Sequence, residues 1–318
     1  MLKKFPGGVW PVMITPFTEK NEVDYEGLAQ LVDWYIEQGA SGLFAVCQSS
    51  EMFFLSREER ERAAAFVKRQ AKGRVPVIAS GHVSDSLDEQ LRDIHGMIEQ
   101  GVDAVILITN RLAKKDATDH TFRKCLEKLL NYIPNETPLG FYECPYPYKR
   151  LLSPEILKDC AQSGRFYFLK DTCCDIDLIE KKIEAAQGTP LKIYNANAAT
   201  LLASLEAGAA GYSGIMCNFH PELYVWLLKN WEQYHELAEE IEDFLSISSL
   251  IEKQYYPVNA KYNLILRGLK IGLYTRSQDY RQFTQTNKLE IRQLMTLATI
   301  YKKKLRQSII RLRQEQEP

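Results

Sequence analysis

The stretch "FYFLKDTCCD" (residues 166–175) shows how the chain folds and where its chemistry lies. It opens with a short apolar run, Phe166 to Leu169, and continues into Lys170 and Asp171. The run predicts a buried β-strand. A lysine at a buried position costs about 3 kcal/mol or more unless it is ion-paired or neutral. The stretch therefore predicts a buried strand that ends in a lysine with a functional role beyond packing.

Short apolar runs of this kind alternate with amphipathic stretches through most of the chain. Strands are predicted at residues 8–15, 42–46, 75–81, 103–109, 138–143, 166–171, 191–196 and 211–216. Helices are predicted at 23–39, 56–73, 86–101, 119–133, 153–164, 175–188, 197–208 and 221–245. Such alternation indicates a parallel sheet that is covered on both faces. Eight units predict an α/β fold closed into a (β/α)8 TIM barrel, with an open doubly wound sheet as the alternative.

The alternation stops near residue 245, and the remaining chain is predicted to be helical, including 263–273 and 289–314. We therefore expect a barrel over residues 1–240 and a C-terminal helical extension over 241–318 that packs on one side of it. The basic run from Lys302 to Arg313 is typical of a solvated helix face. A polyanion-binding role for this run is the alternative.

Composition narrows the class of protein. The chain has 318 residues, 45% of them hydrophobic and 25% charged, with a net charge of −1, which gives no indication of a nucleic-acid partner. No apolar run of about 18 residues predicts a membrane helix, and the first residues lack the pattern of a signal peptide. Seven cysteines without clustered spacing suit reduced thiols. We expect a cytoplasmic protein without a metal site or cofactor.

In a barrel, function lies at the carboxyl ends of the strands. The residues predicted at these ends are Thr15, Gln48, Ser49, His82, Asn110, Arg111, Tyr142, Glu143, Lys170, Asp171, Asn195, Asn197, Ser213 and Asn218. This set offers no convincing metal ligands, so lysine, tyrosine and hydroxyl groups must carry any chemistry.

Lys170 and Tyr142 suit imine chemistry. A lysine made neutral by burial is a nucleophile for a ketone or a 2-oxo acid, and the resulting imine is an electron sink. A tyrosine hydroxyl one strand away could move the protons that such a reaction needs. The alternatives are a Lys170 that is ion-paired with Asp171 or Glu143, and a Tyr142 that belongs to the core.

Several motifs together resemble the dihydrodipicolinate synthase/N-acetylneuraminate lyase family of pyruvate-dependent class I aldolases. They are "GGVWPVMITPF" (7–17), "SGLFAVCQSSEMFFLSREER" (41–60), "FYECP" (141–145), "FLKDT" (168–172) and "YYPVNAKYNLILRGL" (255–269). The resemblance covers roughly residues 5–300. It implies that Lys170 is the Schiff-base lysine, that Tyr142 relays protons, and that the protein is a homo-oligomer, a dimer or tetramer.

The resemblance also implies a site for the substrate carboxylate. Gln48 and Ser49 stand where the family has a loop of hydroxyl residues, glycines and backbone N–H groups that binds this carboxylate. The other residues that we expect to bind substrate are Ser50, Thr15, Ser213 and Ala196.

The chain departs from the family pattern at several of these positions. Gln48 cannot relay a proton as a hydroxyl does, and Leu112 replaces a tyrosine of the synthases. Pro147 stands where the synthases place an arginine, and Ala198-Ala199 replaces the acidic pair of the sialic acid lyases. The departures argue against both activities. Four residues that are particular to this chain are candidates for setting its substrate specificity: His82, Arg111, Glu143 and Asn195.

The leading hypothesis is a Schiff-base lyase that joins or splits pyruvate and an aldehyde, acting on a 2-keto-3-deoxy sugar acid or a related 2-oxo acid. The "KDT" of residues 170–172 is similar to that branch of the family. Alternatives within the class are a dehydratase or hydratase-aldolase, or an activity like that of the synthases or sialic acid lyases. Outside it, the chain could bind 2-oxo acids without turnover, or bind a partner through its basic C-terminal helix.

Overall fold

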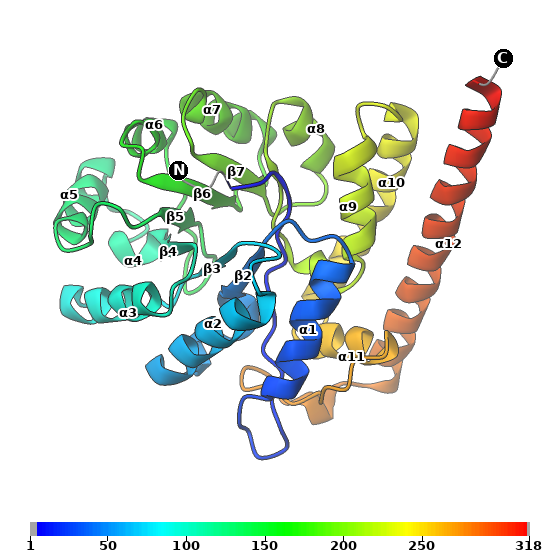
Figure 1. Cartoon of the computed structure of the whole chain (residues 1–318), viewed down its shortest axis with the longest axis horizontal. Helices are drawn as coiled ribbons and strands as arrows, with labels where there is room; N and C mark the ends of the chain where they lie inside the picture. Colours follow the sequence, from blue (N-terminus) through cyan, green and yellow to red (C-terminus); the bar gives the residue numbers. More distant parts are fainter. Residues whose placement is uncertain (1–4, 317–318) are drawn as a thin grey trace.

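Eight parallel strands form one sheet in the computed structural model, which describes residues 5–316 (Figure 1). The order of neighbours is β1-β8-β7-β6-β5-β4-β3-β2. The strands are β1 (Gly8–Val9), β2 (Leu43–Val46), β3 (Val77–Ala79), β4 (Ala104–Ile108), β5 (Leu139–Tyr142), β6 (Phe166–Asp171), β7 (Lys192–Asn195) and β8 (Gly211–Tyr212). The predicted (β/α)8 TIM barrel is confirmed, and β6 has the bounds that the sequence predicts.

The first segment closes the barrel, although it is a much shorter strand than the 8–15 predicted. Gly8 and Val9 pair with β8, whereas Val12 forms a bridge with Phe44 of β2. Pro11 lies between them and has no N–H to donate, so a regular ladder cannot run through it. Its carbonyl still accepts the amide of Phe44 at 3.0 Å. The segment therefore changes partner at Pro11 and joins the two outer strands.

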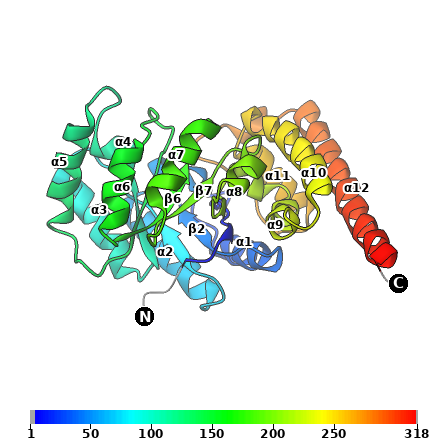
Figure 2. The ribbon, with the colours of Figure 1, turned by 90° about the horizontal axis from the view of Figure 1, so that it is seen from above.

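Helices follow the strands around the barrel (Figures 1 and 2). Ser56 caps α2 through a capping box with Glu59, and Ser153 caps α6 with Pro154 at its first position, as the sequence predicts. The helices of the barrel are α1 (Tyr25–Glu37), α2 (Arg57–Ala71), α3 (Leu87–Glu99), α4 (Thr109–Leu112), α5 (Asp119–Leu130), α6 (Pro154–Gln162), α7 (Ile176–Ala186), α8 (Leu201–Glu206) and α9 (Pro221–Asn230).

The C-terminal part consists of α10 (His235–Ser248), α11 (Val258–Leu266) and α12 (Gln285–Gln316). The single helix predicted over 221–245 is wrong, because the chain turns between α9 and α10. There the carbonyl of Asn230 accepts the amides of both Gln233 and Tyr234. The helix predicted over 263–273 ends early, because Gly268 adopts φ 94°, a left-handed conformation that terminates helices.

Short 3-10 turns complete the fold: η1 (Gln48–Ser50), η2 (Met52–Phe54), η3 (Ile215–Asn218), η4 (Ser249–Lys253) and η5 (Tyr280–Gln282). In both ribbon views α12 runs along the outside of α10, away from the strands (Figures 1 and 2). Of the predicted basic run 302–313, the side chains of residues 309 and 311–313 lie outside what the structure describes, as do residues 1–4. The domain boundary at residue 240 stays a prediction.

Aromatic side chains fill the centre of the barrel. Phe168 of β6 stacks on Tyr194 of β7 with ring centroids 4.3 Å apart, and its ring also meets those of Trp10 and Phe44. Side chains two residues apart on a strand point the same way. Lys170 therefore points into the barrel above Phe168, with hydrophobic rings beneath it.

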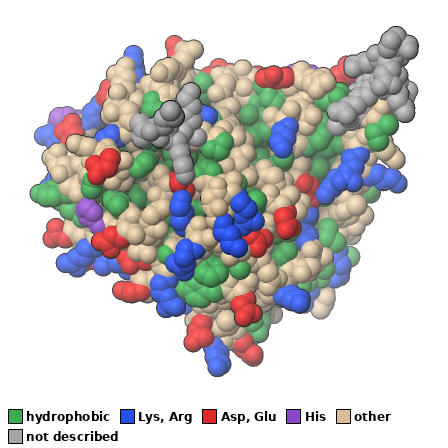
Figure 3. All heavy atoms as spheres, viewed as in Figure 1, with side chains coloured by type: hydrophobic (Ala, Val, Ile, Leu, Met, Phe, Trp, Pro, Cys, Tyr) green, Lys and Arg blue, Asp and Glu red, His purple; other side chains and the backbone are tan. Residues whose placement is uncertain are grey.

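The surface gives no single charged field on the face that Figure 3 shows, where basic and acidic side chains are interspersed. Within residues 5–316, none of the helices combines the length and apolar character needed to cross a bilayer. The seven cysteines are free thiols.

Candidate active site

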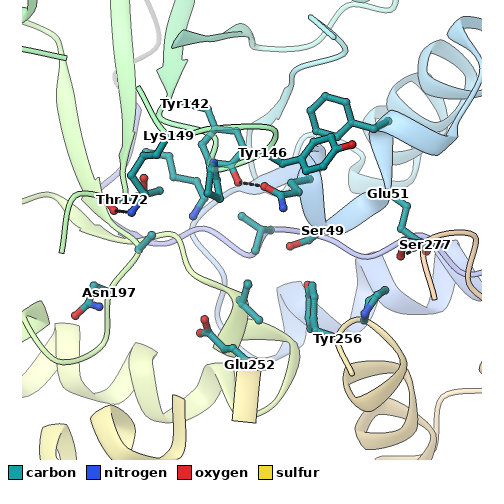
Figure 4. A pocket seen from close by; sticks show the side chains of 18 of the residues that line it. Ser49, Glu51, Tyr142, Tyr146, Lys149, Thr172, Asn197, Glu252, Tyr256 and Ser277 are labelled. Atoms are coloured by element: carbon teal, nitrogen blue, oxygen red, sulfur yellow. Dashed lines mark hydrogen bonds between the residues drawn. The ribbon is translucent and has the colours of Figure 1, made fainter. Parts of the chain in front are cut away.

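A cavity of about 460 Å³ lies at the carboxyl ends of the strands, and both Lys170 and Tyr142 line it. Its walls come from two parts of the chain, as Figure 4 shows. Tyr142, Lys149 and Thr172 lie on the upper side of that view, and Glu252 and Tyr256 lie on the lower side. The barrel thus supplies the first wall, and the C-terminal part supplies much of a second wall, beside Asn197 of the barrel.

Lys170 is 4% exposed and has no carboxylate within ion-pair distance among the described residues. Its Nζ donates a hydrogen bond to the carbonyl of Ser213 and lies 5.2 Å from the centroid of the Tyr142 ring. Burial lowers the pKa of this lysine, since desolvation disfavours the charged ammonium. A larger fraction of Lys170 is therefore the neutral, nucleophilic amine than for a solvated lysine.

Tyr142 is the cross-strand neighbour of Lys170 in the β5–β6 register. Its hydroxyl lies 3.5 Å from Oε1 of Gln48, to which it donates, and the Sγ of Cys144 lies 3.3 Å from the same oxygen. Burial raises the pKa of Tyr142, so the phenol is protonated. The sequence-based pairing of Lys170 with Tyr142 at neighbouring strand ends matches this placement.

The predicted substrate-binding residues divide into two groups. Gln48, Ser49 and Ala196 line the cavity. Ser50, Thr15 and Ser213 do not, because their side chains hold the backbone around it. The Ser50 hydroxyl donates to the carbonyl of Cys47, Thr15 donates to that of Ser50, and Ser213 donates to that of Trp10. Ser213 still meets Lys170 through its own carbonyl.

The four possible specificity residues also lie outside the described lining of the cavity, which differs from the expectation. Glu143 follows Tyr142 on the strand and so points to the opposite side. There it is fully buried with Asp171 and Lys182 of α7, whose Nζ lies 2.6 Å from Glu143 and 2.5 Å from Asp171. Burial raises the pKa of Glu143 to about 7, although the positive charge of Lys182 acts to lower it.

The other three of these residues serve the framework. His82 is fully buried between Gln90 and the amide of Ile108, and desolvation lowers its pKa to about 4. Asn195 is enclosed by Thr200 and Ser204. The guanidinium of Arg111 pairs with Asp85 and stands behind Phe53, 5.5 Å from the centre of that ring. Phe53, and not Arg111, faces the cavity.

Sequence reasoning missed the cavity residues that come from the C-terminal part: Glu252, Tyr256, Pro257, Ser277 and Gln278. The motif at 255–269 marks the position of Tyr256 and Pro257, but no local pattern reveals Glu252 or Ser277.

Glu51 attaches this second wall to the barrel. Its Oε1 accepts the amide of Arg276 and both the amide and hydroxyl of Ser277, all within 2.8 Å. Lys261 lies 3.5 Å from its other oxygen, and Arg276 makes two 2.7 Å contacts with Glu59 of α2. A buried carboxylate and an arginine thus hold the 276–278 loop over the cavity.

Within residues 5–316, no three or more His, Cys, Asp or Glu side chains are grouped so that they could hold a metal ion. The cavity instead joins a buried lysine and a tyrosine at the strand ends of a (β/α)8 barrel. This fold and this pair of residues define the class of aldolase-type lyases.

The chain belongs to the dihydrodipicolinate synthetase family, whose model matches residues 5–298. It is 28% identical over 272 residues to the 4-hydroxy-tetrahydrodipicolinate synthase of Bacillus subtilis, which covers 84% of this chain and 91% of that protein. The enzyme of the same name from Methanocaldococcus jannaschii is 27% identical over 287 residues, 87% of this chain and 96% of the relative.

A solved structure has the same fold. It is that of YagE, a prophage protein of the dihydrodipicolinic acid synthase family from E. coli K12, in complex with pyruvate. The two structures have a TM-score of 0.81 at 22% identity, covering 93% of this chain and 98% of the other.

Proposed function

We propose that this protein forms or cleaves a carbon–carbon bond between pyruvate and an aldehyde through an imine on Lys170. The observation that carries the proposal is the state of Lys170: buried, without a carboxylate partner among the described residues, and 5.2 Å from the ring of Tyr142. An amine in this state attacks a ketone carbon, and the imine then accepts the electron pair of the bond that breaks.

The neighbouring residues have separate parts in this proposal. Ser49 and Gln48 bind the carboxylate of the 2-oxo acid beside Ala196, and the Tyr142 hydroxyl donates to the oxygen that leaves the ketone as water. The volume of about 460 Å³ suits a small ligand and exceeds what pyruvate alone would fill. Asn197, Ser277 and Gln278 add amide and hydroxyl groups to the lining, which favours a hydroxylated aldehyde and hence a 2-keto-3-deoxy sugar acid.

Borohydride trapping with pyruvate tests the proposal. The intact mass should increase by a reduced pyruvyl group, and peptide mapping should place that group on Lys170. Lys170→Ala should give no adduct, whereas Lys181→Ala, an exposed lysine on α7, should give the wild-type amount. If wild-type protein binds pyruvate but forms no adduct with it or with longer 2-oxo acids, the protein binds without reacting and the proposal fails.

We also propose that the protein works as a cytoplasmic homo-oligomer, a dimer or a tetramer. The free state of all seven cysteines supports a reducing compartment, and the family resemblance supports the assembly. Light scattering on the purified chain would contradict the second part if it gave the 36.6 kDa mass of one chain at micromolar concentration.

A further inference from the structure

Glu252 is a carboxylate in the cavity to which the proposed reaction assigns no role. It lies on η4 in the C-terminal part, across the cavity from Tyr142 in Figure 4, and it lines the same cavity as Lys170. Among the described residues no donor forms a hydrogen bond with its carboxylate, and the charge that acts on it is that of Lys170. A half-buried carboxylate with no partner of its own is free to meet a bound molecule.

The other carboxylate of the cavity is in the opposite state. Oε1 of Glu51 accepts hydrogen bonds from Arg276 and Ser277, and Oε2 has no hydrogen bond but lies 3.5 Å from Nζ of Lys261, so this carboxylate is already ion-paired within the fold. Of these two acids, Glu252 is therefore the one that can exchange a proton with a ligand.

The proton path on the Tyr142 side stops early. The Tyr142 hydroxyl donates to Oε1 of Gln48, an amide oxygen that carries no proton to pass on. A carbon–carbon bond-forming enzyme of this type must remove a proton from C3 of the imine and return one, so a second group is needed. The cavity offers Glu252 for this task.

We infer that Glu252 is the general base and general acid that moves the C3 proton of the pyruvate imine on Lys170. The inference rests on the proposed function. The Glu252 carboxylate takes a proton from the methyl carbon C3, and the C–H electron pair becomes the C2–C3 double bond. The π pair of the protonated imine moves onto nitrogen, which gives a neutral enamine. In the reverse step Glu252 returns the proton to C3, so no oxidant or reductant is needed.

Electrostatics supports this geometry. Burial raises the pKa of Glu252 to about 7, and Lys170 opposes the rise. A base with a pKa near the working pH is the most effective in such steps. The imine keeps a positive charge at the Lys170 nitrogen, which favours the carboxylate form of Glu252 once pyruvate is bound. Apart from Glu51, the other titratable groups of the lining are Tyr142, Tyr146, Lys149, Lys170, Cys174 and Tyr256.

Deuterium exchange into the methyl group of pyruvate measures this step without any aldehyde. The full-length protein is incubated with saturating pyruvate in D2O, and loss of the methyl signal is followed by proton NMR. Wild-type protein should exchange the methyl protons, and Glu252→Gln should slow the exchange by about 10²- to 10⁴-fold. Asp243→Asn, which removes an exposed carboxylate of α10, is the matched control and should keep the wild-type rate.

Two further readouts separate a proton-transfer role from a structural one. Borohydride trapping of Glu252→Gln should still give the Lys170 adduct in the wild-type amount. Wild-type exchange should rise through an inflection at or below pH 7 that Glu252→Gln lacks, and Glu252→Asp should recover part of the rate. Wild-type exchange in Glu252→Gln overturns the inference. Failure of trapping in wild-type protein instead overturns the proposed function itself.

Discussion

Two buried lysines lie on opposite sides of the β5–β6 strand ends, and they are in opposite states. Lys182 contacts two carboxylates, those of Glu143 and Asp171, and this raises its pKa despite burial. Lys170 donates a hydrogen bond to a carbonyl and lies over an aromatic ring, has no ion pair within residues 5–316, and its pKa is lowered by burial. The difference teaches that burial alone does not set the charge of a lysine; its partners do.

The alternation of the strands keeps these two environments apart. Tyr142 and Lys170 point into the cavity, so the residues that follow them, Glu143 and Asp171, point away from it. Each acid lies next in sequence to a cavity residue, yet neither neutralises Lys170. Instead Lys182 joins both acids and fixes the ends of the two strands that carry the cavity pair.

Replacing Lys170 should have the largest effect. Lys170→Ala removes the amine that is proposed to form the imine, so methyl exchange of pyruvate in D2O should fall by at least about 10⁴-fold, to the uncatalysed background. Circular dichroism should show an unchanged fold, because no buried charge is left without a partner. Exchange that persists in this variant would mean that Lys170 is not the reacting amine.

Replacing Lys182 should affect stability instead. Lys182→Met leaves two buried carboxylates without their cation, which should lower the free energy of unfolding by about 3–5 kcal/mol. Lys181→Met, on the adjacent exposed position of α7, should change it by no more than about 0.5 kcal/mol. Urea unfolding of both variants checks this. A loss under about 1 kcal/mol for Lys182→Met would show that the cluster contributes little.

The two amines should also differ in reactivity within one protein. Reductive methylation of the native protein near neutral pH, followed by peptide mapping, should modify Lys170 at least about tenfold faster than Lys182. The cavity reaches Lys170, and a larger share of it is neutral, whereas Lys182 is enclosed and charged. Comparable labelling of the two would contradict the difference in their states.

The smallest effect concerns the pH dependence of stability. The pKa of Lys170 is lower in the folded protein than its ordinary value of 10.5. At pH values between these two pKa values, the unfolded chain therefore binds more protons than the folded protein. Lys170 therefore lowers stability at neutral pH, and this penalty disappears as the pH approaches 10.5. The gain in stability of Lys170→Met over wild type should therefore be larger at pH 7 than at pH 10. Thermal unfolding of both proteins at both pH values would refute this if the gain were the same at pH 10 or larger there.

Local sequence patterns were enough to predict the surroundings of Lys170, but not those of Lys182. The apolar run at 166–169, the alternation around it and the motif residues predicted the barrel and the placement of Tyr142 beside Lys170. The same reasoning put His82, Arg111, Glu143 and Asn195 at the pocket, because it listed every polar residue near a predicted strand end. Glu143 and Asn195 lie on the face opposite to the cavity, as strand alternation requires, whereas Arg111 lies in α4 and His82 lies beyond the end of β3.

The remainder depends on contacts between distant parts of the chain. Lys182 lies in a helix that the sequence predicts as an ordinary amphipathic one, and its two acids come from different strands. Glu252 reaches the cavity only because the C-terminal part folds back onto the barrel, where Glu51 holds the Ser277 amide and hydroxyl. No periodicity within either segment contains that information.

The attachment at Glu51 also has a consequence during synthesis of the protein. Strand β8 ends at Tyr212, so all eight strands leave the ribosome well before Ser277 does. At about 5–20 residues per second, the nascent chain spends several seconds with Lys170 already made and its second wall still missing. A chain that stops soon after Tyr212 has all eight strands but lacks Glu252, Tyr256 and Ser277. The cavity therefore receives its second wall only after the strands of the barrel have been made.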